Sequence, residues 1–164
     1  MNAPVYTYSD EHHAIALCGN VVVTYSTDMP NPIYLEAWTQ ATDSLLARGH
    51  ETIAVVTVID SRTRTPNDDS KQLIRSTIER HKDRIDAFAY VVEGRGFSAA
   101  AMRSALSLIN LAARYPFRQK VFSSIEEGAR WLVANTKGAP PNGVNMLSAA
   151  VQTMRGNVRL AVAG

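Results

Sequence analysis

Two short, almost wholly apolar runs in the middle of the chain constrain the fold most strongly. Residues 52–59 and 87–92 are too short for core helices and lack the polar alternation of half-exposed strands. Such runs are typical of strands buried on both faces, and each is followed by a polar turn and a segment with helical spacing. Because alternating strands and helices need crossover connections, the sequence predicts a mostly parallel sheet covered by helices.

The N-terminal part of the chain adds an antiparallel pair to this sheet. Residues 14–18 and 21–25 are rich in β-forming side chains, and the two residues between them, Gly19 and Asn20, are typical of a hairpin turn. A last short strand is predicted over residues 120–123. The predicted fold class is therefore α/β, with a mixed, mostly parallel five-stranded sheet, an N-terminal β-hairpin and crossover helices.

Helix boundaries are marked by capping residues. The first predicted helix begins near Pro32, which suits a first turn, and ends near Gly49, which suits a C-terminal cap. Asn67 or Asp68 caps the second, whose apolar stripe is predicted to continue to Ile85. A fourth predicted helix, residues 124–136, opens with a capping box.

The third predicted helix, residues 98–114, is apolar over more than half of its circumference. Leu108 and Leu111 widen its apolar stripe, and Asn110 is placed on its wet side. Such a helix must cover its apolar sides with its own core or with a partner. Both alternatives stay open from the sequence.

Proline and glycine mark a division near the C-terminus. The linker-like composition of residues 136–145 predicts a domain over residues 1–137 and a C-terminal extension over residues 138–164. That extension is predicted to hold a helix over residues 145–155, which Gly156 ends.

Composition excludes several classes of protein. A chain of 164 residues with 46% hydrophobic content is too apolar for a wholly disordered protein, and its length suits a single domain. One cysteine, Cys18, excludes an internal disulfide framework and a zinc site built on several thiolates. No signal peptide or membrane span is recognisable, so a cytoplasmic location is expected.

The order of elements over residues 14–134 resembles the STAS fold of anti-sigma-factor antagonists and the related small SEC14-like bacterial proteins. The best local match is the strand 119–123 with the following Ser-Ile-Glu-Glu-Gly-Ala-Arg-Trp-Leu, which is similar to the last helix of the SEC14-like proteins. The resemblance implies a regulatory module that acts through protein contacts. In the antagonists a serine at the start of the second helix is phosphorylated to switch partners, and Ser70 holds the comparable position here.

Candidate binding residues lie where the predicted strands end. Asp60 and Ser61 follow the first buried strand, at the edge where parallel sheets usually bind ligands. Ser61 and Ser70 are candidate regulatory sites, because a phosphate on Ser70 would meet a helix N-terminus. A loop start and an ordinary first-turn polar residue are the alternative interpretations.

A glycine-rich turn follows the second buried strand. Gly94, Arg95, Gly96 and Ser98 belong to a G-x-G-x-x-A pattern between a strand and a predicted helix, a spacing that lets a phosphate approach backbone N–H groups. A tight turn with Ser98 as helix cap explains the same residues without a nucleotide.

No metal, cofactor or catalytic constellation is predicted. Residues 10–13, Asp-Glu-His-His, are interpreted as a solvated N-terminal segment, since neighbours in a strand point to opposite faces. His81 is interpreted as a half-buried, hydrogen-bonded histidine, and Cys18 as an inert packed thiol.

Charge is unevenly distributed along the chain. Residues 1–101 carry nine Lys or Arg and thirteen Asp or Glu, a net charge of −4, whereas residues 102–164 carry eight and two, a net charge of +6. No run of basic residues interleaved with aromatics suggests nucleic-acid binding. A protein partner, or a second copy of the chain in a homodimer, is the favoured interpretation.

The sequence therefore predicts a non-enzymatic STAS-like module that acts by protein–protein interaction, including partner switching. The alternative is a domain that binds a small apolar or phosphate-bearing ligand at the carboxyl ends of the strands. A third possibility is an enzyme using Asp60 or Glu93 as acid or base, which requires a desolvated carboxyl with a raised pKa.

Overall fold

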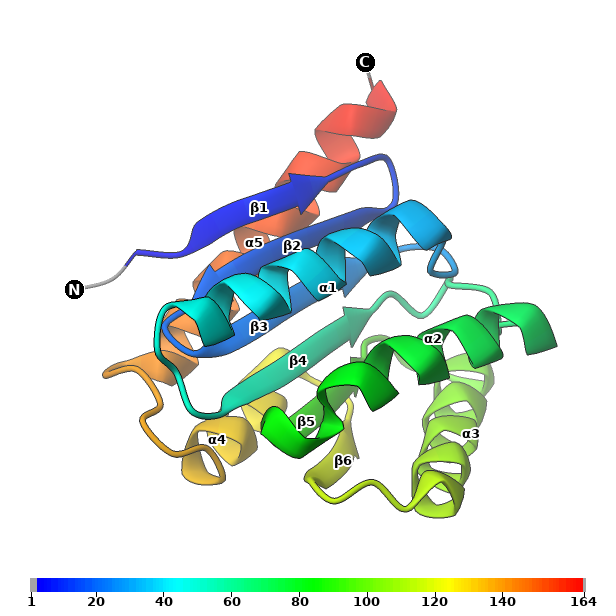
Figure 1. Ribbon diagram of the computed structural model, residues 1–164. Coiled ribbons are helices and arrows are strands. Elements are labelled where there is room, and N and C mark those ends of the chain that lie inside the picture. The colour runs from blue at the N-terminus through cyan, green and yellow to red at the C-terminus, as the bar shows by residue number, and fades with distance from the viewer. Residues whose placement is uncertain (1–2, 164) are drawn as a thin grey trace.

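The computed structural model describes residues 3–163, which form a six-stranded sheet between two layers of helices (Figure 1). The strands lie side by side in chain order. They are β1 (Val5–Ser9), β2 (His13–Cys18), β3 (Val21–Ser26), β4 (Ile53–Ile59), β5 (Ile85–Val92) and β6 (Arg118–Phe122). The first two pairings are antiparallel and the other three are parallel. The α/β class with a mixed, mostly parallel sheet is thus confirmed, with six strands in place of five.

The sixth strand is β1, which the sequence pattern does not predict. It pairs with β2 along the edge of the sheet, and the register of this pairing shifts between Tyr6 and Tyr8. Most of β1 is exposed, so its residues show no burial pattern that would mark a strand. The interpretation of residues 10–13 as a solvated segment is wrong for His13, which begins β2 and is 1% exposed.

Five helices cover the sheet on its two faces (Figure 1). The parallel strands β3 to β6 are neighbours in chain order. When right-handed crossovers join such strands, all the connecting helices lie on the same face of the sheet. That face carries α1 (Pro32–Ala47), α2 (Asp68–His81) and α3 (Phe97–Ala113). The other face is covered by the two helices that come after β6 in the chain, α4 (Ile125–Ala134) and α5 (Gly143–Ala163).

The C-terminal helix belongs to the core. Leu147, Ala150, Val151 and Met154 of α5 are fully buried against β2, β3 and α4. The prediction that Gly156 ends this helix is wrong, because α5 continues to Ala163 and buries Val158 two residues beyond the glycine. The loop between α4 and α5 coincides with the predicted boundary near residue 137.

The close approach of α4 to the sheet depends on a glycine. A Cβ on Gly128 would lie 2.7 Å from Val91 Cγ2, closer than side chains pack. Together with the buried Leu132 and Ala129, this glycine lets α4 pack directly on β5.

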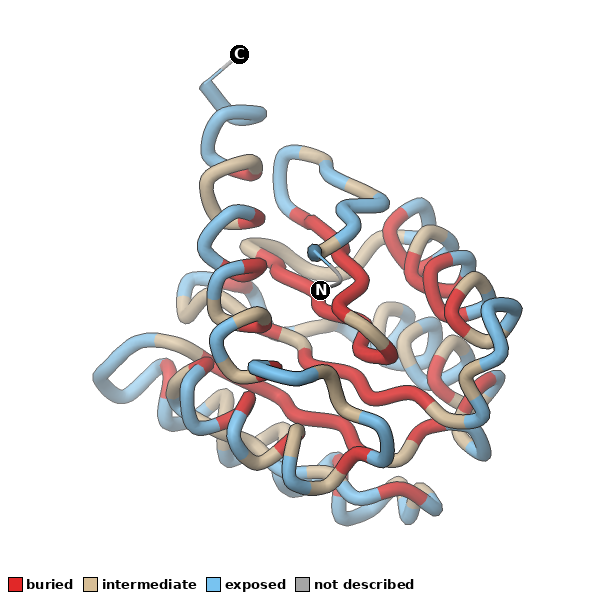
Figure 2. Tube along the Cα trace, turned by 90° about the vertical axis from the view of Figure 1, so that its left-hand side faces the viewer, coloured by how far each residue is buried: buried red, intermediate tan, exposed pale blue. Residues whose placement is uncertain are grey.

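On the opposite face, α1 and the start of α2 follow their predicted caps. Asn31 and Asn67 accept hydrogen bonds from the N–H groups of Tyr34 and Ser70, respectively. Ile85, predicted as the end of the second helix's stripe, instead opens β5, because the short helix η1 (Lys82–Arg84) ends the helical segment. Burial is concentrated on the strands and the inner sides of the helices, while the last turn of α5 extends beyond them (Figure 2). Among the described residues, no helix is both long and apolar enough to cross a membrane.

Candidate ligand-binding cleft

The third helix covers its part of the sheet incompletely. α3 packs on β5 and β6, while α2 packs on α1, which leaves the two helices apart (Figure 1). Only Ala99 and Asn110 of α3 are buried. The prediction that Asn110 lies on the solvent-exposed side of α3 is therefore wrong. Asn110 lies on the side of the helix that packs on the sheet.

The space left between α1, α2, α3 and the sheet is a cavity of about 760 Å³. Its floor is formed by Thr57 and Ile59 of β4 and by Phe88 and Tyr90 of β5. Its walls are apolar and come from the three helices: Tyr34, Leu35, Trp38, Ile74, Ile78, Met102, Ala105, Leu106 and Ile109. Cavities of this size, lined mainly by apolar groups with a few polar ones, are the usual form of small-molecule sites.

A second hollow continues the first between α2 and α3. It measures about 950 Å³ and reaches Asn110 and Tyr115. The two hollows share Pro66, Lys71, Ile74, Ile78, Tyr90, Leu106 and Ile109. They are therefore parts of one elongated cleft, which we call the α2–α3 cleft.

Aromatic rings form much of the wall and floor of this cleft. Phe88 and Tyr90 stack with their centroids 4.3 Å apart, and Phe117 stacks between Phe88 and Tyr115. Burial raises the pKa of Tyr90, so its hydroxyl is neutral throughout the physiological range. At the other wall, the Trp38 ring meets the edge of His81, whose Nε2 lies 2.7 Å from Asp43 Oδ1.

Polar residues gather at the rim, where β4 ends. The Arg62 guanidinium donates from Nε and Nη2 to the two oxygens of Asp60, each at 3.0 Å. These bonds outweigh the partial burial of Asp60 and lower the pKa of its carboxyl. Arg64 pairs in the same bidentate way with Asp28 at 3.1 and 3.0 Å.

The glycine turn lies against this rim. Gly94 has φ of 104°, and a Cβ there would lie 2.6 Å from both Cβ and Oγ of Ser61. Gly96, with φ of 100°, is the N-cap of α3. The helix begins at Phe97, so the interpretation of Ser98 as its cap is wrong.

The structure brings together some of the residues singled out from the sequence. Ser61 and Ser98 line the cleft, and Asp60 and Gly94 contact residues of its rim. Arg95 is exposed, and neither it nor Ser70 lines the cleft. Ser70 is half-buried in the first turn of α2, where its backbone N–H donates to the cap Asn67.

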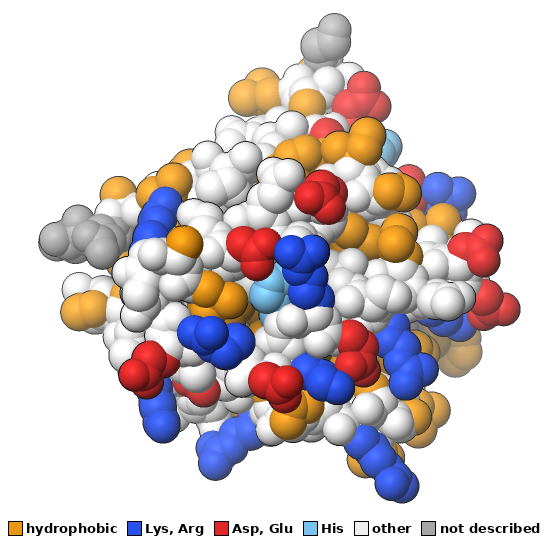
Figure 3. Space-filling model, viewed as in Figure 1, with side chains coloured by type: hydrophobic (Ala, Val, Ile, Leu, Met, Phe, Trp, Pro, Cys, Tyr) orange, Lys and Arg blue, Asp and Glu red, His pale blue; other side chains and the backbone are white. Residues whose placement is uncertain are grey.

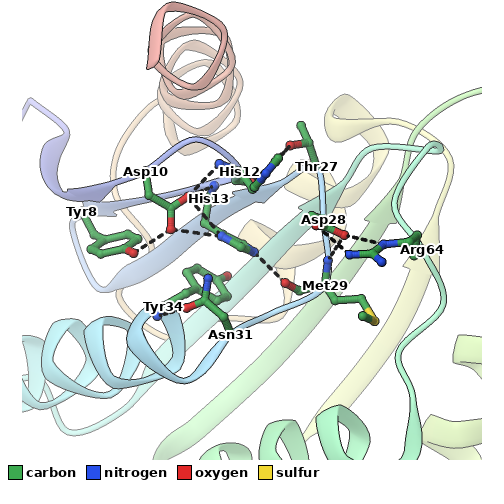
Figure 4. A network of polar contacts seen from close by, with 10 residues as sticks. All are labelled: Tyr8, Asp10, His12, His13, Thr27, Asp28, Met29, Asn31, Tyr34 and Arg64. Carbon is green, nitrogen blue, oxygen red and sulfur yellow. Dashed lines mark hydrogen bonds and ion pairs between the residues drawn. The ribbon is translucent and has the colours of Figure 1, made fainter. Parts of the chain in front are cut away.

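A polar network beside the cleft was missed from the sequence (Figure 4). His13 lies with Nδ1 3.1 Å from Asp10 Oδ1 and Nε2 3.0 Å from the carbonyl oxygen of Met29. Its ring stacks on Tyr34, a wall residue of the cleft, with centroids 4.4 Å apart. The network thus ties the turn between β1 and β2 to the segment that leads into α1.

Asp10 is the centre of that network. It accepts hydrogen bonds from Tyr8 Oη at 2.6 Å and from the backbone N–H groups of His12 and His13 at 2.7 Å each. Burial opposes its ionisation, but these bonds and the neighbouring His13 outweigh burial and lower the pKa of Asp10. Burial and the same carboxylate raise the pKa of Tyr8 to about 12.

Other candidate groups lie on the opposite face or in the core. Glu93 pairs with Arg155 of α5, with both carboxylate oxygens 2.6 Å from Nη2, and Arg155 lies over the Tyr25 ring. Burial raises the pKa of the Cys18 thiol to about 12. Within residues 3–163, no three His, Cys, Asp or Glu side chains are grouped so that they could hold a metal ion.

Comparison with known proteins identifies the fold. The chain is similar to the crystal structure of an uncharacterised protein of the DUF3478 family, with a SpoIIAA-like fold, from Shewanella loihica. The TM-score is 0.53 at 16% identity, over 80% of this chain and 97% of that one. No protein-family model and no curated protein matches the sequence. The chain has a SpoIIAA-like fold, which confirms the predicted STAS-type topology.

Proposed function

We propose that this protein binds a small, elongated apolar molecule in the α2–α3 cleft. The observation that carries the proposal is the cleft itself: α2 and α3 stand apart over the sheet, and a largely apolar space that both helices and the aromatic floor on β5 line is left between them. Filling such a space removes apolar surface from water, which favours an apolar ligand. The first hollow of the cleft reaches Ser61 and Arg62, which follow the end of β4, the edge of the sheet that the sequence interpretation gave to its ligand-binding alternative.

The carboxyl groups near the rim of the cleft favour ligand binding without catalysis. A carboxyl acting as acid or base near neutral pH needs a raised pKa, whereas the pKa of Asp60 is lowered by Arg62. Glu93 is held by Arg155 on the face of the sheet covered by α5. We therefore propose a carrier or sensor for the ligand, without catalysis.

The chain contains its own reporter for the test. Trp38 lines the cleft, whereas Trp131, the second of two tryptophans, packs on Phe122 of β6 on the opposite face of the sheet. In a Trp131→Phe variant, titration with 1-octanol, 1-decanol and 1-dodecanol should change the Trp38 emission. Affinity should rise about fourfold for each added CH₂ until the chain exceeds the cleft.

A pair of alanines on α3 provides the matched control. Ala105 lines the cleft and Ala100 is exposed outside it. We expect Ala105→Phe to fill the cleft and weaken dodecanol binding at least about tenfold, because it removes space for several methylenes. Ala100→Phe should leave binding unchanged. Equal affinities in the two variants, or no binding to the natural chain, would overturn the proposal.

A second candidate function is protein contact through the outer face of α3. Phe97, Leu108 and Leu111 are 89%, 68% and 77% exposed, and the two leucines lie outside the cleft. An exposed apolar row of this kind favours a partner or a second copy of the chain. Light scattering tests self-association directly: a dimer that becomes monomeric in a Leu108→Ser, Leu111→Ser variant would support it, and a monomer at all concentrations would refute self-association.

A further inference from the structure

The side chains that line the α2–α3 cleft include more cations than carboxylates. The cations are Arg62, Arg64, Lys71 and Arg75, and the carboxylates are Asp28 and Glu79. Asp60 and Asp68, which pair with Arg62 and Lys71, lie outside the lining. In the space-filling view, basic, acidic and hydrophobic side chains are interspersed over the lower right of this face, where α2 and α3 lie (Figure 3). A cation beside an apolar space that is not firmly held by a carboxylate is complementary to a ligand with an apolar chain and an acidic head.

The four cations are not equally available to a ligand. Arg62 and Arg64 are each engaged by both oxygens of a carboxylate, Asp60 and Asp28, at 3.0 to 3.1 Å. Bidentate pairs of this geometry neutralise the guanidinium and fix its orientation. Arg62 and Arg64 therefore affect a ligand mainly through the shape that they give to the rim.

Lys71 is paired much more loosely. Its Nζ lies 3.8 Å from Asp68 Oδ1, the longest of the ion pairs in the described chain, and the Asp68 side chain is fully exposed. An exposed pair at this distance contributes little and is readily exchanged for another anion. The Lys71 side chain itself is 47% exposed, so a ligand head can reach it.

The place of Lys71 on its helix gives it a defined relation to the apolar space. Residues 71, 74 and 78 of α2 share one face, since they are three and seven positions apart. Ile74 and Ile78 lie along the cleft, and Lys71, at the end of this row, lines both hollows. A chain seated on the two isoleucines would therefore place its head within reach of the ammonium group.

We infer that the natural ligand is an amphiphile with an acidic head group and that Lys71 is its anchor. The inference rests on the proposed function and narrows it to one ligand class. Arg75 carries the same charge at the second hollow only, next to Glu79 and Tyr115, and does not hold the head.

Three probes with the same chain and different heads test the inference: dodecanoate, 1-dodecanol and dodecyltrimethylammonium, each below its micelle concentration. Binding is followed by Trp38 fluorescence in the Trp131→Phe background. Dodecanoate should bind at least about tenfold more tightly than dodecanol, the gain typical of a hydrogen bond to a charged group. The cationic probe should bind most weakly.

Charge-removing variants locate the anchor. We expect Lys71→Gln to weaken dodecanoate binding much more than dodecanol binding, and so to reduce the preference for dodecanoate to about twofold. Arg75→Gln removes a charge from the same cleft, and Arg130→Gln removes one from the opposite helix layer. Both should retain the preference.

The outcomes separate the two proposals. If dodecanol binds as tightly as dodecanoate and Ala105→Phe blocks both, the acidic head is refuted and the apolar cleft stands. If Arg75→Gln abolishes the preference as fully as Lys71→Gln, the assignment of Lys71 is overturned. If none of the three probes binds, both the inference and the proposed function fail.

Discussion

At the scale of single residues, the network around Asp10 links the edge of the sheet to the entrance of α1. Three hydrogen bonds reach one half-exposed carboxylate, and the stacked ring of His13 carries the contact on to Tyr34 in the cleft wall. Nothing in the spacing of residues 10–13 predicts this, because the contacts depend on the pairing of β1 with β2. The position of Tyr34 in the cleft wall thus depends on Asp10, which is far from Tyr34 in the sequence.

Asp10→Asn tests that dependence through pH. Because the pKa of Asp10 in the folded chain lies below its unfolded value, its stabilisation is present above about pH 4 and is lost as pH falls through the folded pKa. The substitution should lower the free energy of unfolding at pH 7 by about 1–3 kcal/mol. Urea denaturation at pH 7 and pH 3 should show a smaller loss on acidification for the variant than for the natural chain; equal losses would refute this role.

The two glycines of the rim form a matched pair at the same scale. Gly94 and Gly96 have φ of 104° and 100°, but a Cβ would collide with Ser61 only at Gly94. Both alanine variants carry backbone strain of about 1–3 kcal/mol, and Gly94→Ala should be the less stable of the two. Thermal unfolding of the pair measures the difference, and a Gly96→Ala variant as unstable as Gly94→Ala would show that the contact with Ser61 is unimportant.

At the scale of elements, α5 decides whether the sheet has two covered faces. α1, α2 and α3 share one face, so the apolar side chains of β2 and β3 that point the other way depend on α5. The prediction of a division at residue 137 describes the loop before this helix. Because Leu147 and Met154 of α5 are fully buried, residues 1–137 without this helix would lack part of the core.

We therefore expect a chain ending at residue 137 to aggregate or to remain unfolded. Within the full chain, Met154→Ala should cost about 2–5 kcal/mol, as for other buried methionines, and Leu160→Ala, at a 72% exposed position, less than about 0.5 kcal/mol. Circular dichroism and urea denaturation check both. A stable, monomeric fragment 1–137 would instead support two separate units.

The elements also show why sequence prediction succeeded where it did. β4 and β5 are buried on both faces, so their apolar runs identify them, whereas β1 is exposed and carries no such signal. Gly156 suggested a helix end, but Val158 beyond it is buried and holds the helix in place. Local signals thus predicted the elements that lie inside the core and failed at its margins.

At the scale of the whole molecule, the proposed site is a gap between helices. Residues of the rim, such as Asp60 and Ser61, could be predicted because they follow a recognisable strand. The cleft could not be predicted from the sequence, because it depends on the distance between α2 and α3. If these helices had packed on each other, the same apolar residues would have formed a closed core. Leu106 and Ile109 are half-buried or exposed in this structure for that reason.

NMR mapping of a bound ligand is the decisive test of the cleft. When dodecanoate is added to ¹⁵N-labelled protein, we predict backbone amide shifts that saturate and are centred on Ile74, Tyr90 and Leu106, with none at Leu132 or Met154 on the opposite face. Shifts centred on α4 and α5, or a spectrum that does not change up to the solubility limit of the probe, would contradict the assignment of the α2–α3 cleft as a binding site.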